Sequence, residues 1–511
     1  MKHVIIFSLF LWLLSSCGIE NLENGDFPVG TFDYAILNGS VIDGTGNAEY
    51  RADILIRGDS IAFIGNIDTS QITARIIDAS NLVVTPGFID AHAHGAPFED
   101  SFENFLSMGV TTILLGQDGR SPVHRLVSPS AFFDSLENHS LPLNMAFLAG
   151  HGDLREALHL SEKKSLEIPE IEALCQHLEQ ALDAGCLGLS TGLEYLPGAL
   201  AQEPELTAMA KTVGSHGRIL MSHLRSEDDQ EMNNSIEELL NQGKFCRVHI
   251  SHIKVVYGKS NDRAQEILAI IEDAQSRGIQ ISTDVYPYNA SYTGIGIVFP
   301  EWAKTKKDFD LVRSNRETEL RSFIFQKIMD RNGPEATLFA TRPFTGKTLA
   351  EVASESGQDF VDILLKIGPV GASGAYFVMN EALQETFIVD PDIMISSDGG
   401  PSLRHPRSYG SFSKIIEKYV VNEQKLSLEA AIHKMSGLTA SRLPIADRGI
   451  LRQGFKADIL VFNPTQIQAR STYANPYVKS KGLKKVFING SLVIDQDSIL
   501  NLDSGKIIKS M

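Results

Sequence analysis

The 511-residue sequence contains little cysteine and no excess of positive charge. Four cysteines in a chain of this length exclude a scaffold held together by disulfides. Lysine and arginine number 46 against 63 aspartates and glutamates, which gives a formal net charge of −17. A field of that sign repels a phosphate backbone and so argues against a nucleic-acid partner. After the first twenty residues no apolar run is long enough to predict a membrane-spanning helix.

The first residues resemble a bacterial export signal. Two basic or polar residues, Lys2 and His3, precede an apolar run from Val4 to Leu14. That run is too short to span a bilayer comfortably, but it has the length of a signal-peptide core. It ends in Leu14-Ser15-Ser16-Cys17-Gly18, which resembles the lipobox of bacterial lipoproteins.

We therefore expect residues 1–17 to be a lipoprotein signal peptide with its lipobox, and residues 18–31 to be a polar tether. Cleavage before Cys17 would leave a lipidated cysteine at the mature N-terminus. The expected location is that of an exported bacterial lipoprotein, anchored in a membrane and facing the periplasm or the cell surface. The alternative is a plain secretory signal with an incidental cysteine.

Short β-like segments occupy both ends of the remaining chain. Between residues 32 and 85, runs such as Asp53-Ile54-Leu55-Ile56 alternate with turn dipeptides such as Asn38-Gly39. A similar pattern of short β-like runs recurs in residues 446–500, for instance in Ala457-Asp458-Ile459-Leu460. We expect one small β-sandwich domain built from both chain ends.

The middle of the chain, residues 86–445, alternates strand-like and helix-like segments, which is typical of parallel βα units. Eight strands can be placed, as a (β/α)₈ TIM-type barrel requires. They lie around Phe88–Ala91, Thr111–Leu115, Asn144–Ala149, Leu187–Ser190, Ile219–Ser222, Arg247–Ser251, Gln280–Thr283 and Ile393–Ser396. The gap between the seventh and eighth strands is about a hundred residues, far beyond a normal connection. We expect an inserted helical subdomain there, at about residues 300–385.

Two histidines follow the first barrel strand, in the segment Pro86–His94. A strand has period two, so His92 and His94 point to the same side. Paired imidazoles at the carboxyl end of a barrel strand form half of a metal site.

Later strands also end in candidate ligands. His223 closes the fifth strand, His252 the sixth and Asp398 the eighth. Alternation along the sixth strand favours His252 as the inward-facing histidine and His249 as a packing residue. Four histidines and an aspartate, without thiolates, favour Zn²⁺ or another borderline divalent ion.

These residues resemble the motifs of the amidohydrolase superfamily and, within it, of the N-acyl-D-amino-acid deacylases (D-aminoacylases). The resemblance extends from about Phe32 to Val493. The motifs that carry it are Pro86–His94, Gly109-Val110-Thr111-Thr112, Ser190–Tyr195, Ser222–Glu227, Ser251–Lys254, Asp284–Tyr288, His405-Pro406-Arg407 and Ala457-Asp458. The resemblance implies a metal-dependent hydrolase that cleaves N-acyl-D-amino acids into a carboxylate and a free D-amino acid.

The resemblance also implies a role for each matching residue. His92, His94 and Asp398 would hold one zinc ion, and His223 and His252 would hold a second. Asp398 would act as general base toward the attacking water. The residues that match the family's grip on the substrate α-carboxylate are Lys254, Tyr286 and Arg407, with Tyr288 as a fallback for the tyrosine.

In one place the chain departs from the family. Many D-aminoacylases carry Gly-Asn-Cys-Gly after the second strand, and its cysteine bridges the metals, whereas here Asp118 stands in the cysteine position. The fourth strand ends in Glu194, where some other amidohydrolases carry a bridging carboxylate or carbamylated lysine. Alternation aligns Glu194 with Ser190 and Gly192, small residues that would leave space for a metal. We therefore prefer Glu194 as the bridging ligand over Asp118, and leave open whether one metal or two are bound.

Two other functions compete with this hypothesis. One is a dihydroorotase-like or isoaspartyl-dipeptidase-like amidohydrolase acting on a cyclic amide or a dipeptide. Two observations argue against it: the absence of a motif lysine, and the presence of the motifs Asp284–Tyr288 and His405–Arg407. The other is a surface binding protein that lost catalysis, which would be expected to lack some of the five ligands, and none is missing. The motifs do not encode the acyl group, the amino-acid side chain or the oligomeric state.

Overall fold

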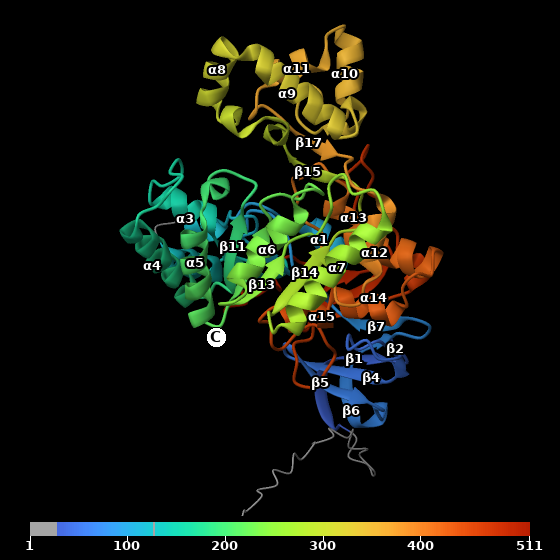
Figure 1. The fold of residues 1–511 in the computed structure, drawn as a ribbon. Coiled ribbons are helices and arrows are strands. Elements are labelled where there is room, and N and C mark those ends of the chain that lie inside the picture. The colour runs from blue at the N-terminus through green and yellow to red at the C-terminus, as the bar shows by residue number, and fades with distance from the viewer. Residues whose placement is uncertain (1–27, 126–127, 511) are drawn as a thin grey trace, which may run out of the picture.

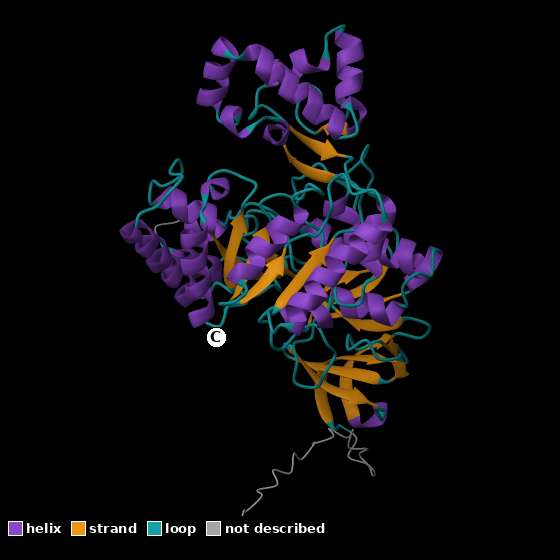
Figure 2. Ribbon diagram, viewed as in Figure 1, coloured by secondary structure: helices purple, strands orange, loops and turns teal. Residues whose placement is uncertain are grey.

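The computed structural model describes residues 28–125 and 128–510 (Figure 1). The expected signal peptide, Cys17 and most of the expected tether lie outside these residues. Within them, no helix combines the length and the apolar character needed to cross a bilayer. The described chain forms a barrel of strands wrapped by helices, with a β-rich domain at one end and a helical lobe at the other (Figure 2).

Eight parallel strands form the barrel, one for each strand that the sequence predicts. They are β8 (Phe88–Asp90), β9 (Val110–Leu115), β10 (Asn144–Gly150), β11 (Gly188–Gly192), β12 (Ile219–His223), β13 (Arg247–Ile250), β14 (Ile281–Val285) and β18 (Met394–Ile395). Neighbours in the sheet follow chain order from β8 to β14, with β18 beside β14. Every strand residue except Arg247 is buried, as expected for a parallel sheet covered on both faces. The predicted (β/α)₈ fold is confirmed.

The barrel closes through the backbone just beyond its first and last strands. The amide of Asp398 donates to the carbonyl of His92 at 2.9 Å, and the amide of His94 donates to the carbonyl of Gly399 at 2.7 Å. A parallel bridge joins Ala93 to Gly399 between these two bonds. The closing seam therefore runs through three of the candidate metal ligands.

Helices surround the barrel. They are α1 (Glu103–Ser107), α2 (Pro129–Glu137), α3 (His151–Ala157), α4 (Ile168–Ala184), α5 (Glu203–Ser215), α6 (Met232–Gln242), α7 (Asn261–Ser276), α12 (Glu381–Val389), α13 (Arg407–Lys414), α14 (Leu428–Met435) and α15 (Gly437–Arg442). The longest, α4, begins at a capping box formed by Glu167 and Glu170. It buries Leu174, Leu178 and Ala181, whose spacing of three or four residues places them on one face toward the barrel.

The β-rich domain contains two sheets that share one core. The four-stranded sheet contains β1 (Gly30–Leu37), β4 (Asp53–Arg57), β5 (Ser60–Gly65) and β6 (Ile72–Asp78). The seven-stranded sheet contains β2 (Ser40–Val41), β3 (Tyr50–Arg51), β7 (Val83–Pro86), β19 (Ile459–Phe462), β20 (Leu483–Ile488), β21 (Ser491–Asp495) and β22 (Ser498–Ile499). Its strands β7 and β19 pair antiparallel and join the two chain ends. Ile54 of one sheet and Phe487 of the other lie in one hydrophobic cluster. β1 begins at Gly30, two residues before the expected start of the β domain at residue 32.

The long connection between β14 and β18 forms the lobe (Figure 1). Its helices are α8 (Lys306–Asn315), α9 (Glu317–Asp330), α10 (Leu349–Ser356) and α11 (Phe360–Ile367). It also contains a three-stranded sheet of β15 (Ser291–Gly294), β16 (Thr337–Phe339) and β17 (Ser373–Tyr376), which the sequence analysis did not predict. Strands of three or four residues are too short to show a period of two. The insertion is therefore α+β and begins earlier than residue 300, while α12 packs against the barrel helix α7.

A buried ionic network fastens the β-rich domain to the barrel. One oxygen of Asp458 accepts hydrogen bonds from the Arg448 guanidinium and from Asn144 Nδ2, the latter at 2.9 Å. The other oxygen accepts from the backbone amide of Asn489 at 2.8 Å. The Arg448 and Asp458 side chains are 5% and 4% exposed, so each charge depends on the other for compensation.

We predict that Asp458→Ala destabilises the protein by about 3–5 kcal/mol, because it leaves the Arg448 cation buried without an anion. The measurement is the urea midpoint of the intact protein, followed by circular dichroism. Asp59→Ala is the matched control: its carboxylate is 54% exposed beside Lys456, and its loss should cost at most about 1 kcal/mol. Equal midpoints for the two variants would contradict the role of the network.

Candidate metal centre

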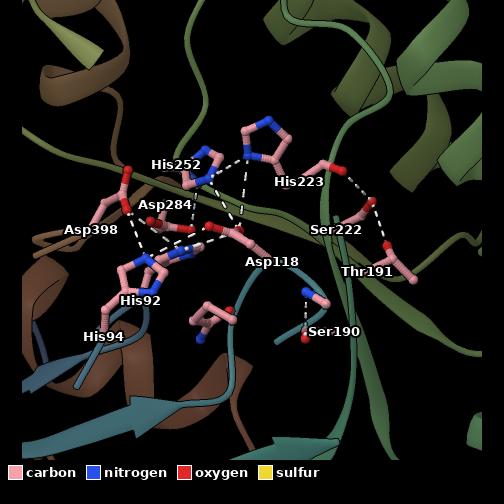
Figure 3. A network of polar contacts seen from close by, with 12 residues as sticks. His92, His94, Asp118, Ser190, Thr191, Ser222, His223, His252, Asp284 and Asp398 are labelled. Atoms are coloured by element: carbon pink, nitrogen blue, oxygen red, sulfur yellow. Dashed lines mark hydrogen bonds and ion pairs between the residues drawn. The ribbon is translucent and has the colours of Figure 1, made fainter. Parts of the chain in front are cut away.

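Four imidazoles surround one carboxylate at the carboxyl ends of the barrel strands (Figure 3). Nε2 of His92 and Nε2 of His252 each lie 3.4 Å from Oδ1 of Asp118. His223 Nδ1 lies 3.9 Å from the same oxygen, and His94 Nε2 lies 3.6 Å from the other one. Asp118 thus lies between the histidine pair of the first strand and the pair from the fifth and sixth strands.

The surrounding donor atoms form two groups that share Asp118. One group consists of His92, His94, Asp118 and Asp398, and the other consists of Asp118, His223 and His252. Within each group the donor atoms lie within 4.8 Å of one another. Burial alone would raise the pKa of Asp118, but the neighbouring His92 and His252 outweigh it and hold the pKa well below its usual range. The shared carboxylate is therefore ionised.

These residues fit a divalent metal. His92 Nε2 and Asp118 Oδ1 are buried and have no hydrogen-bond partner among the described residues, a costly state unless a cation accepts their lone pairs. Imidazole nitrogens and carboxylate oxygens are the ligands that Zn²⁺ takes in catalytic sites. The donor set therefore suits zinc, and the shared carboxylate gives it the form of a site for one or two ions.

Three of the candidate ligands have left-handed backbone conformations. The φ angles are +55° at Asp118, +38° at His252 and +47° at Asp398. Residues other than glycine rarely adopt this region, and holding one there costs of order 1 kcal/mol or more. Because of this backbone conformation, the side chains do not follow the alternation of the preceding strands. They point toward the centre of the barrel mouth instead.

The geometry favours Asp118 over Glu194, the preferred bridge in the sequence analysis, because Asp118 lies near four histidines and Glu194 contacts His223. β11 ends at Gly192, so strand alternation does not extend to Glu194. The space beside Ser190 and Gly192 is filled by the Asp118 turn: the Gly119 amide donates to Ser190 Oγ at 3.0 Å, and a Cβ on Gly192 would lie 2.2 Å from the Asp118 carbonyl oxygen. Asp118, the residue in the cysteine position, is therefore the carboxylate that the two histidine pairs share.

Glu194 and Glu227 support the histidines from outside. Glu194 Oε2 lies 3.0 Å from Nε2 of His223, the ring nitrogen that faces away from Asp118. Glu227 Oε1 lies 3.2 Å from Nδ1 of His252, again the outer nitrogen. Carboxylates in this position orient a ligating imidazole and increase its basicity. Sequence reasoning assigned no role to Glu227, although its place four residues after His223, in the same motif, was a signal.

A further carboxylate, Asp284, lies beneath the histidines. Its Oδ1 accepts the His252 amide at 2.9 Å and lies 2.6 Å from His249 Nε2. His249 is buried and also contacts Ser282, so it belongs to the packing below the site, as the sequence analysis predicted.

The candidate general base is held in place by an arginine. Asp398 Oδ1 lies 3.1 Å from His94 Nε2, while Asp398 Oδ2 pairs with Nη1 of Arg407 at 2.7 Å. Burial would raise the pKa of Asp398, but Arg407 and His252 outweigh it and hold the pKa well below its usual range. Asp398 is thus ionised, with one oxygen directed at the histidines.

The residues predicted to grip the substrate carboxylate lie together. The Tyr286 ring centroid lies 5.8 Å from Lys254 Nζ and 4.8 Å from Arg407 Cζ. Burial raises the pKa of Tyr286 to about 12 despite these cations, so its hydroxyl stays protonated at neutral pH. Lys254 Nζ lies 2.5 Å from Glu227 Oε1. The ring of the fallback, Tyr288, lies 3.9 Å from Lys414 Nζ.

A cavity of about 420 Å³ opens onto these groups. Its barrel wall includes Asp118, Lys254, Asp398 and Arg407, and its lobe wall includes Tyr292, Thr293, Ile297, Arg331 and Ser373. That volume suits a small organic molecule. The inserted lobe therefore covers the metal-binding residues and supplies one side of the binding site.

No family model matches the chain. It is 32% identical to the N-acyl-D-glutamate deacylase of Alcaligenes xylosoxydans xylosoxydans, over 91% of this chain and 94% of that protein. It is 30% identical to the D-aminoacylase of the same organism, over 93% of this chain and 97% of that protein. Its fold is similar to the crystal structure of the N-acyl-D-glutamate deacylase from Bordetella bronchiseptica in complex with zinc and a phosphonate inhibitor. The TM-score is 0.80, and the two sequences are 29% identical; the match covers 94% of this chain and 100% of that chain.

We predict that the protein as purified contains zinc or a similar divalent ion, and that Asp118→Ala loses most of it because both donor groups lose their shared ligand. Glu194→Gln should retain most of the metal at saturation, with affinity lowered by about 10–100-fold, because it alters only the outer contact to His223. Metal content per chain is measured by mass spectrometry after dialysis. Full occupancy in Asp118→Ala together with loss in Glu194→Gln would restore Glu194 as the bridge.

Proposed function

The chain belongs to the N-acyl-D-amino-acid deacylase (D-aminoacylase) family of the amidohydrolases, and on that premise we propose that it hydrolyses the amide bond of N-acyl-D-amino acids with zinc as its cofactor. The observation that carries the proposal is the Asp118 carboxylate among four imidazoles, next to an ionised Asp398, at the bottom of a cavity. The alternative of a binding protein without catalysis predicted gaps in the ligand set, whereas all five ligands converge.

Hydrolysis of an amide needs a nucleophile, a proton acceptor and stabilisation of charge on the carbonyl oxygen. A divalent ion held by the two donor groups supplies the stabilisation and makes water a stronger nucleophile at neutral pH. Asp398 accepts the proton of the attacking water at Oδ1, because Arg407 occupies Oδ2. The same carboxylic acid then returns the proton to the leaving amine nitrogen.

Lys254 and Arg407 orient the substrate through its α-carboxylate. Both cations belong to the cavity wall and flank the Tyr286 ring. A guanidinium can bind a carboxylate through two parallel hydrogen bonds, which fixes direction as well as charge. A substrate carboxylate would join the existing pairs of these cations with Glu227 and Asp398. The scissile amide then lies next to the ionised base.

We predict hydrolysis of N-acetyl-D-alanine, with the L enantiomer slower by more than about tenfold. N-acetyl-D-alaninamide, in which the α-carboxylate is replaced by a neutral amide, should be slower by about 30-fold or more, as expected for the loss of a buried ion pair. Asp398→Asn should lower kcat by about 10²–10⁴-fold. Release of acetate measures the rate on each substrate and in the variant.

Asp392→Asn serves as the control, because that carboxylate is 69% exposed and should leave the rate unchanged. Equal rates on the acid and its amide would argue against the carboxylate grip, and equal rates on the two enantiomers would refute the stereochemical preference.

We also propose export of the protein and lipidation at Cys17. The support is the sequence alone: an apolar run of signal-peptide length, Val4 to Leu14, that leads into the lipobox-like Leu14–Gly18. The enzyme would then act outside the cytoplasm, on N-acyl amino acids that reach the periplasm or the cell surface.

We predict that the wild-type protein is recovered in the membrane fraction and is released by detergent. Cys17→Ser should appear in the soluble exported fraction or remain as an unprocessed precursor of higher mass. Fractionation followed by immunoblotting and mass spectrometry of the N-terminus measures this. Cys186→Ser is the control, since that cysteine is buried in the hydrophobic core and its replacement should not alter location. Wild-type protein found wholly in the cytosol would reject the proposal.

A further inference from the structure

Arg331 is a buried cation in the wall of the cavity. It follows helix α9 of the lobe and is only 3% exposed. Its guanidinium carbon lies 5.9 Å from the ring centroid of Tyr257 and 5.1 Å from that of Tyr376. Nη1 donates to the Tyr257 hydroxyl at 3.1 Å, whereas Nε has no hydrogen-bond partner in the described part of the chain.

The other lysine and arginines of the cavity wall form ion pairs, unlike Arg331. Lys254 pairs with Glu227, Arg407 pairs with Asp398, and Arg120 pairs with Asp153 at 3.0 Å. Arg331 forms no ion pair with any residue in 28–125 or 128–510. Two aromatic faces and one neutral hydroxyl stabilise a guanidinium only partly, so this position favours an anion.

The free edge of the guanidinium indicates what kind of anion fits. Nη1 donates to Tyr257, and neither Nε, which is itself buried, nor Nη2 has an acceptor among the described side chains. Two parallel N–H groups match the two oxygens of a carboxylate. Because Arg331 shares the cavity with Lys254 and Arg407, that carboxylate would belong to the same molecule whose α-carboxylate they hold.

We propose that Arg331 binds a second carboxylate of the substrate, so that the enzyme prefers N-acyl-D-amino acids carrying two carboxylates. This inference rests on the proposed function and specifies its substrate class. The second carboxylate can come from the side chain of the amino acid or from the far end of the acyl group. Arg331 acts here as a specificity residue and takes no part in cleaving the amide.

The experiment compares matched pairs of substrates that differ only by this charge. N-acetyl-D-glutamate is compared with N-acetyl-D-glutamine, and N-succinyl-D-alanine with its terminal amide. For wild-type enzyme we expect kcat/KM to be about 30-fold or more higher for the charged member of one pair. The pair that shows the preference identifies the source of the second carboxylate.

In Arg331→Gln the ratio within that pair should fall to about one, whereas Arg331→Lys should keep part of it. A ratio measured within one variant does not depend on the fraction of protein that is folded. If Arg331→Gln does not accumulate, Arg331→Met replaces it, because its apolar stem still packs against Tyr257 and Tyr376. Arg120→Gln removes the same charge from a cation that is already paired, and it should retain the wild-type ratio.

Two results would overturn the inference: ratios near one for both pairs in the wild type, or a high ratio that persists in Arg331→Gln. Either can occur while N-acetyl-D-alanine is hydrolysed normally, which leaves the proposed function intact. Failure to hydrolyse any N-acyl-D-amino acid would instead overturn the proposed function itself.

Discussion

The site depends on the closure of the barrel between its first and last strands. The two backbone hydrogen bonds that make this closure involve His92, His94 and Asp398, which are also candidate ligands. Residues some three hundred positions apart are thereby held in direct contact, and the remaining histidines arrive at the same rim because all eight strands are parallel. The arrangement of imidazoles around Asp118 follows from this one constraint.

The sequence predicts well those parts of the fold and site that depend on local sequence patterns. Each barrel strand is a short apolar run followed by a helical segment, and all eight were placed correctly. The histidines and Asp398 could be found because each directly follows such a run. The β-rich domain was recognisable for the same reason, since hairpin dipeptides interrupt its short strands.

What the sequence does not predict is geometry beyond the end of a strand. His252 was selected by alternation, but the strand ends at Ile250 and the φ angle of His252 is positive. The same limit produced the preference for Glu194, because the small residues preceding it accommodate the Asp118 turn instead. Arg331 follows a helix in a lobe whose placement is set by long-range packing, so no periodicity could assign it to the cavity.

The lobe and the β-rich domain lie at opposite ends of the barrel (Figure 1). This arrangement has a consequence for the proposed lipid anchor. The described chain enters the fold through β1, in the domain farthest from the lobe. If the protein is lipidated at Cys17 as proposed, the anchor would attach on the side of the β-rich domain, and the barrel would lie between that domain and the lobe. On that proposal, the cavity under the lobe would lie at the end of the molecule away from the anchored domain.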